Sequence, residues 1–351
     1  MSHDVLVHLQ WAHAFDPTPR REDLAVYHVP FDELGAERPI ERALGEAALR
    51  AERIAVVGSS GSGKSSVIAH VLGPLTEGVA PILVPVTTEP AETVVEPRGL
   101  VSHLVQVIAD YATDIANLMP SKSRDDALSQ AAPTRGHRRD HVSGRGAVSL
   151  PWMGTELALE VRQQTEHSEP MTRSTFAMLE VVHQVLVAIG VHGLTPVLIF
   201  DDTDRWLRGG AYESPERLAA SFFGRALPVL VELPCALAVA VHREYVENQA
   251  LKQLLGRVLE IQVMVPALRQ AHEVGRILES RLRAHEPEPG LGLEDVFEPE
   301  AVNRLFDHYR ERYRGELRSV LRTAHVALAE ACDDQRDRIS AQLVDSAVST
   351  W

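Results

Sequence analysis

The chain has 351 residues, enough for one large domain or two modest ones. Hydrophobic residues make up 45% of it, yet no apolar run reaches the roughly 18 residues of a transmembrane helix. The first residues lack the basic segment of a signal peptide, so we expect a cytoplasmic protein without membrane contact. The formal net charge of −14 disfavours binding to nucleic acid by overall electrostatic attraction. DNA is still a possible partner through a local basic patch, but the net charge does not indicate it.

Residues 1–35 combine a short apolar stretch with several prolines, which predicts an irregular arm that wraps a core. Trp11, Phe15 and Phe31 are the aromatic residues of this arm that we expect to be buried. After the arm, residues 37–50 place apolar side chains three and four positions apart, with charged residues between them. This spacing predicts an amphipathic helix.

The strongest motif in the chain follows an apolar strand at residues 53–57 and precedes a helix-forming sequence. It fits the pattern G-x-x-x-x-G-K-[ST]. In such a loop the glycines permit backbone angles that a side chain would forbid, and successive amide groups form a nest for phosphate. The motif residues are Gly58, Ser59, Ser60, Gly61, Ser62, Gly63, Lys64 and Ser65.

This motif predicts an ATP site. Lys64 supplies a cation for the β- and γ-phosphates, and the Ser65 hydroxyl can bind Mg²⁺, with Ser66 as a backup hydroxyl. The alternative is a flexible Gly/Ser linker, which the flanking strand and helix disfavour.

The next segments predict a sheet edge and an insertion. Residues 80–86 form an apolar run with two prolines, which places this strand at the edge of a sheet. A helix is expected over residues 100–118, after which the periodicity is lost. The polar insertion at residues 119–170 contains a basic run from Arg135 to Arg145. This run is either a loop for an anionic partner or a solvated segment, and the lack of interleaved aromatic residues favours the second interpretation.

A helix over residues 172–190 leads to a second chemical motif, the apolar run 196–200 followed by Asp201 and Asp202. Continuous apolar runs are typical of buried parallel strands, and ligands bind beyond the carboxyl ends of such strands. Asp201 is therefore placed to hold Mg²⁺ directly or through water, as a Walker B aspartate does. Asp202 is a candidate general base for the attacking water, and its alternative role is to cap the next helix.

The remaining α/β elements are a helix over residues 215–233 and strands over residues 235–241 and 256–266. The first of these strands ends at His242, which is either a sensor of the γ-phosphate or a loop residue. Only helices follow, over residues 270–285, 299–312, 316–332 and 340–348. The sequence thus predicts an α/β P-loop NTPase core with a parallel sheet at residues 36–266 and a small all-helical lid domain at residues 267–351.

A P-loop core followed by a helical lid resembles the AAA+ ATPase family, nearest the origin-recognition and initiator branch and the signal-transducing, STAND-like switch ATPases. The resemblance covers about residues 36–348. It implies that Arg257 reaches into the site of a neighbouring subunit of a homo-oligomer, and that Arg318, in the stretch from Gly315, is the sensor-2 arginine of the lid. A surface salt bridge is the alternative for either arginine.

Some features depart from the family pattern. The acidic pair is Asp-Asp where Asp-Glu is usual, which implies slow hydrolysis, and the sensor-1 position is held by His242. No segment after the lid matches the winged-helix domain of many initiators, so we do not expect a dedicated initiator. We expect a slow ATPase that acts as a nucleotide-dependent assembly or conformational switch on a partner protein. The alternatives are an ATP-dependent DNA-binding adaptor of a replication, transposition or defence system, a kinase, and a scaffold that binds ATP without hydrolysing it.

Overall fold

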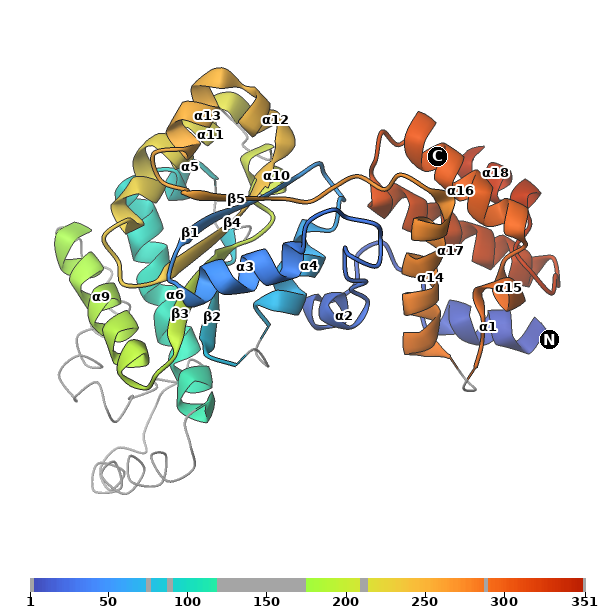
Figure 1. Ribbon diagram of the computed structural model, residues 1–351, viewed down its shortest axis with the longest axis horizontal. Helices are drawn as coiled ribbons and strands as arrows, with labels where there is room; N and C mark the ends of the chain where they lie inside the picture. The colour runs from blue at the N-terminus through green and yellow to red at the C-terminus, as the bar shows by residue number, and fades with distance from the viewer. Residues whose placement is uncertain are drawn as a thin grey trace, which may run out of the picture.

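The computed structural model describes residues 3–73, 77–86, 91–118, 175–208, 214–286 and 290–349. The predicted insertion at residues 119–170, with its basic run, lies outside the described residues. Figure 1 shows an α/β part and a bundle of helices, with the N-terminal segment running between them. Within the described ranges no helix is both long and apolar enough to span a membrane.

Five parallel strands form one sheet in the order β2-β3-β4-β1-β5. The strand β1 lies inside the sheet, between β4 and β5, so both of its edges are paired. The strand β2 lies at the edge, as its proline content predicts. The bounds are β1 Arg53–Gly58, β2 Val79–Leu83, β3 Thr195–Phe200, β4 Ala236–His242 and β5 Ile261–Met264.

Apolar side chains cover both faces of the sheet. On β1, Ile54 and Val56 belong to one apolar cluster, whereas Ala55 and Val57 belong to the other. This alternation follows from the period of two in a strand. The helices α3 (Ile40–Leu49) and α4 (Lys64–Val71) pack in the first cluster. The helices in the second are α6 (Pro97–Leu118), α9 (Thr175–Val191), α11 (Pro215–Ser221) and α13 (Gln249–Leu255).

Several local elements differ from the sequence-based prediction. The helix expected over residues 215–233 begins as α11, continues as a π-helical turn and ends in a 3₁₀ turn that contains Pro228, whose ring removes a backbone donor. The strand expected over residues 256–266 is only the four residues of β5, because Gly256 still belongs to the end of α13. The short helices α5 (Ala91–Val94), α12 (Arg243–Glu247) and α13 were not predicted, whereas α10 (Thr203–Arg208) follows Asp202, where a capped helix was the alternative.

The helices after the sheet form the bundle that the sequence predicts as a lid. The helix α16 packs against α14, α17 and α18 around a common apolar core. The fold class predicted from the sequence is therefore confirmed: a P-loop α/β core with a parallel sheet, followed by a small all-helical part. The bundle consists of α14 (Ala271–His285), α15 (Leu293–Val296), α16 (Pro299–Glu311), α17 (Leu317–Asp333) and α18 (Ala341–Ser349).

The N-terminal arm contains two helices, each of which packs on a different part of the molecule. The helix α1 (His3–Trp11) packs on α17 of the bundle, and α2 (Arg21–Val26) packs on α4 beside the sheet (Figure 1). The arm thus bridges the α/β part and the bundle.

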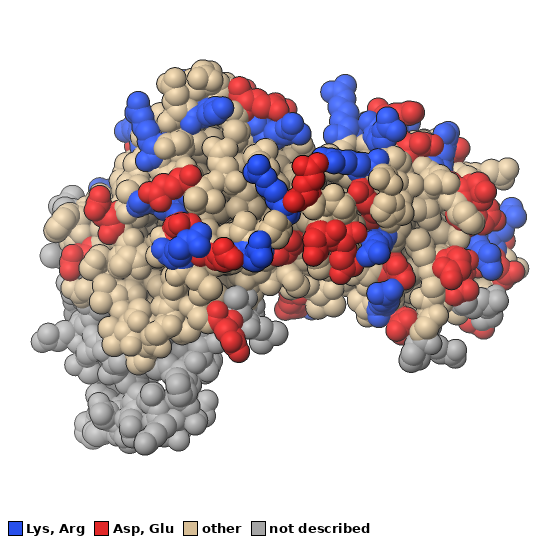
Figure 2. Space-filling view, viewed as in Figure 1, with Lys and Arg blue, Asp and Glu red and all other residues tan. Residues whose placement is uncertain are grey.

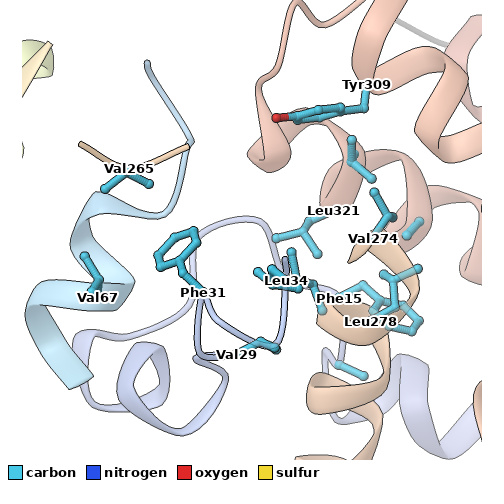
Figure 3. Packing of buried hydrophobic residues seen from close by; sticks show 14 of the residues in the cluster. Phe15, Val29, Phe31, Leu34, Val67, Val265, Val274, Leu278, Tyr309 and Leu321 are labelled. Carbon is cyan, nitrogen blue, oxygen red and sulfur yellow. The ribbon is translucent and has the colours of Figure 1, made fainter. Parts of the chain in front are cut away.

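The aromatic residues of the arm do not all behave as predicted. Phe15 is fully buried against Phe297 of the bundle, with ring centroids 5.4 Å apart. Phe31 is buried next to Val67 of α4 (Figure 3). Trp11, in contrast, is 79% exposed, so the prediction that it is buried is wrong. It is the last residue of α1, beyond the side chains with which that helix packs on the bundle.

Candidate functional site

The loop between β1 and α4 folds tightly because its glycines adopt conformations that other residues avoid. Gly61 and Gly63 have φ values of +65° and +98°. A Cβ added to Gly58 would lie 2.3 Å from the Ser62 Oγ, so only glycine fits there. The sequence motif therefore has the compact loop geometry that its glycines predict.

Polar groups of this loop are placed for an anion. The buried Ser62 hydroxyl and the backbone N–H groups of Gly61 and Gly63 make no hydrogen bond within the described part of the chain. Lys64, the first residue of α4, folds back so that its Nζ donates to the carbonyl oxygens of Gly58 and Ser59, at 3.1 and 2.8 Å. A cation and unpaired donors thus gather at a helix N-terminus, which is the arrangement that holds phosphate.

The two sequence motifs meet at one hydrogen bond. Ser65 Oγ donates to Asp201 Oδ1 at 2.9 Å, and the same oxygen accepts the backbone N–H of Asp202, also at 2.9 Å. Asp201 directly follows β3, and its side chain is 7% exposed. Hydroxyl and carboxylate oxygens are the ligands that Mg²⁺ prefers, so this pair suits a magnesium ion shared with phosphate oxygens.

Asp202 adopts a left-handed conformation, with φ +55°, at the point where β3 turns into α10. Its carbonyl oxygen accepts the N–H of Trp206 at 3.0 Å, which starts that helix. The residue also lines the cleft described next. The backbone of Asp202 therefore begins the helix, and the role of its side chain as a general base stays a prediction.

A cleft of about 510 Å³ lies beside the P-loop. Its walls come from the loop with Asp201, from the N-terminal arm and from the bundle, and its volume is within the usual range for a small-molecule site. The first turn of α17 closes directly onto the loop: Leu317 N–H donates to the Gly61 carbonyl oxygen at 3.2 Å. Arg318 lines the cleft, and its side chain has no partner among the described residues.

His242 and Arg257 do not line this cleft. His242 ends β4 in register with Gly58, but its Nδ1 accepts the Glu244 N–H at 3.3 Å and so caps α12. Arg257 is exposed and precedes β5, whose amino end lies beside Arg53. The amino ends of the strands lie at the end of the sheet opposite the P-loop, so Arg257 cannot serve the site of its own chain.

The arm supplies site residues that the sequence reasoning missed. Arg21, the first residue of α2, donates from its guanidinium to Asp201 Oδ2 at 2.8 Å. Ser66, the predicted backup hydroxyl, instead donates to the Leu24 carbonyl oxygen and lies 3.1 Å from His28 Nδ1. The acidic first turn after Pro19 is a helix-start signal that could have revealed α2, but nothing in the sequence indicates its partner.

A buried arginine of the bundle holds the arm from the other side. Arg281 of α14 donates to the Asp16 carbonyl oxygen at 2.7 Å and lies over the Tyr27 ring, 4.7 Å from its centroid. Burial lowers the pKa of Arg281 to about 10, because the charged form is desolvated. The group still carries its charge at neutral pH. The bundle, the arm and the P-loop thus all border the same cleft.

No family model and no curated protein matches the chain. Two solved structures of the Aeropyrum pernix ORC2 protein are similar to it in fold. The first, of its ADPNP–ADP complexes, has 17% identity and a TM-score of 0.47, over 90% of this chain and 68% of that chain. The second, of its ADP form, has 15% identity and a TM-score of 0.47, over 89% and 68%. This chain itself combines a P-loop, a five-stranded parallel sheet and a helical bundle.

Proposed function

We propose that this chain binds ATP with Mg²⁺ in the cleft beside the P-loop and hydrolyses it slowly, as a switch that acts on a partner protein. The observation that carries the proposal is the hydrogen bond from Ser65 to Asp201 at the mouth of the loop. It joins the two motifs that ATP hydrolysis requires, although they lie 136 residues apart in the sequence.

The roles of the site residues follow from their positions. The loop amides and Lys64 would hold the phosphates, and Ser65 with Asp201 would hold Mg²⁺, which supplies charge neutralisation when bound. Asp202 would orient the attacking water, and a side chain one methylene shorter than glutamate reaches it less well, which accounts for slow turnover. Arg318 lies on the bundle against the loop, so its contact with phosphate would couple the nucleotide to the bundle's position.

The test is nucleotide binding by the Lys64→Ala variant. We expect wild type to bind a fluorescent ATP analogue and to release phosphate without an added acceptor, and Lys64→Ala to lose both. Lys252→Ala, which changes an exposed lysine of α13, is the matched control and should behave as wild type. Unchanged ATP binding by Lys64→Ala would contradict the site assignment. Binding without phosphate release would make the chain a nucleotide-gated scaffold, and release only with an acceptor would make it a kinase.

The DNA-binding adaptor stays an alternative prediction. Its basic run, Arg135 to Arg145, lies outside the described residues. On the face seen in Figure 2, lysine and arginine alternate with aspartate and glutamate over both the α/β part and the bundle. Binding to DNA that requires ATP and weakens steeply with salt would favour the adaptor.

A further inference from the structure

We propose that Arg21 and Mg²⁺ compete for Asp201, so that the helix α2 stays packed on α4 only until the nucleotide and its metal bind. This inference rests on the proposed function, because it assigns a regulatory contact to the same site. It makes the arm a latch that the ligand releases.

The Asp201 carboxylate already uses both of its oxygens. Oδ1 accepts hydrogen bonds from Ser65 and from the Asp202 amide, and Oδ2 accepts the Arg21 guanidinium at 2.8 Å. The guanidinium neutralises a carboxylate that is otherwise almost completely buried. Mg²⁺ would neutralise the same charge, and two cations at one carboxylate repel each other. Asp201 can therefore serve one of them at a time.

The helix α2 is held weakly. None of its six residues is buried, and Val26 is 65% exposed. Leu24 and Ala25 are half-buried, and their carbonyl oxygens are contacted by α4: the Ser66 hydroxyl donates to that of Leu24, and His70 Nδ1 lies 3.4 Å from that of Ala25. A helix with only two half-buried apolar side chains loses less hydrophobic free energy on leaving its partner than one that buries a full apolar stripe. The Arg21 ion pair is thus the charged contact that holds it.

The arm is anchored on either side of α2. Phe15 is fully buried in the bundle, and Phe31 is buried beside α4, with its N–H donating to Glu41 at 2.9 Å. Figure 3 shows Phe31 on the side of α4 and Phe15 on the side of the bundle, with Val29 and Leu34 between them.

Tyr27 and His28, which follow α2, are also held, by His285 of the bundle and by Glu41 of α3. Release therefore concerns α2 itself and requires no unfolding of the bundle.

Hydrogen exchange at the amides of residues 22–27 tests the latch. In wild type we expect exchange to become about tenfold faster when ATP and Mg²⁺ are added, as when a charge-assisted hydrogen bond is lost, and to stay slow with ATP and EDTA. Arg21→Ala should show the fast exchange without any ligand. It should also need about tenfold less Mg²⁺ to reach half-maximal binding of a fluorescent ATP analogue.

The control is Arg20→Ala, which removes the neighbouring arginine, whose side chain is 83% exposed and pairs only with Glu22 at 3.7 Å in the described part of the chain. It should behave as wild type in both measurements. If wild type binds ATP and Mg²⁺ while the exchange of residues 22–27 is unchanged or slower, the latch is wrong and Arg21 is a fixed part of the loaded site. If wild type binds no ATP, the proposed function fails and this inference with it.

Discussion

Gly61 lies where the P-loop meets the first turn of α17. An added Cβ would lie 2.8 Å from Glu316 Cγ and 3.2 Å from the Arg318 amide, so the loop and the bundle approach too closely for any larger residue. The positive φ of Gly61 adds a second constraint. A single residue thus sets the distance between the phosphate loop and the bundle.

We therefore expect Gly61→Ala to weaken both stability and ATP binding. Left-handed strain alone costs roughly 1–2 kcal/mol. The clash with α17 adds to it. The control is Gly193→Ala, because Gly193 has φ +77° but no atom within 4 Å of an added Cβ. Urea unfolding should show a larger loss for Gly61→Ala than for Gly193→Ala, and equal losses would mean that the bundle yields without cost.

Sequence reasoning found the site residues that follow apolar strands. Ser65 and Asp201 could be paired because parallel strands end at the same edge of a sheet. Arg21 could not be found in this way. Its contact with Asp201 spans 180 residues and depends on how an arm without a strand or a motif packs over the loop. Sequence periodicity reports which face of an element is buried, and it carries no information on where an exposed arginine binds.

At the scale of elements, the arm is held by aromatic packing at its centre. Phe15→Ala should cost about 3–5 kcal/mol, the usual range for a fully buried phenylalanine, because it leaves a cavity beside Phe297. Trp11→Ala, in the same arm, should change the free energy of unfolding by less than about 0.5 kcal/mol because Trp11 is exposed. Denaturant unfolding of both variants checks this contrast. Equal losses in the free energy of unfolding would mean that Trp11 packs against the rest of the protein.

A histidine pair makes the contact between arm and bundle sensitive to pH. His325 of α17 stacks on His13, with centroids 6.0 Å apart. Burial lowers the pKa of His325 below its ordinary value of 6.5, and His13 lowers it further, while Asp16 opposes the change. The unfolded chain therefore binds more protons once the pH falls below 6.5, so the stabilisation is complete above that pH and is lost as the pH falls towards the folded-state pKa.

We expect the urea midpoint of wild type to decrease when the pH is lowered from 7 to 5. The midpoint of His325→Gln should decrease less over the same interval. The exposed His272, on α14, provides the control: His272→Gln should keep the dependence of wild type. If His325→Gln and wild type lose stability equally over this range, the pair does not govern the acid response.

The long elements could be predicted from the sequence, whereas the short ones could not. The helix α17 has an apolar stripe over seventeen residues, which makes its period clear. The helices α12 and α13 are five and seven residues long, too short for a reliable period. The caps were the available signal, since the Asn248 side chain accepts the N–H groups of Ala250 and Leu251 at 3.0 and 3.2 Å.

At the scale of the whole molecule, the role of Arg257 in a neighbouring copy stays a prediction. The residue precedes β5 at the end of the sheet opposite the P-loop, and its side chain makes no hydrogen bond or ion pair with the described residues. An arginine there could complete the site of a neighbouring copy. In that role, Arg257→Ala would still bind ATP, but its rate of ATP hydrolysis would decrease by up to a factor on the order of 10³.

Mixing two inactive variants checks this prediction. Arg257→Ala has an intact P-loop, and Lys64→Ala has an intact Arg257, so a mixed assembly contains complete sites between unlike neighbours. Phosphate release should therefore recover on mixing, and the recovery should increase with protein concentration. Arg243→Ala, at another exposed arginine of the α/β part, should hydrolyse ATP as wild type does. No recovery on mixing would contradict a shared site.

The packing of α1 on α17 has a consequence for how the protein is made. His8 lies 3.2 Å from the carbonyl oxygen of His285, 277 residues further along the chain. During synthesis Leu6, Leu9 and Phe15 leave the ribosome long before the helices that cover them. Until those helices exist, these side chains stay open to chaperones and to aggregation. The helix α1 thus packs among helices that are made much later, and the cleft beside the P-loop lacks one of its walls until those helices exist.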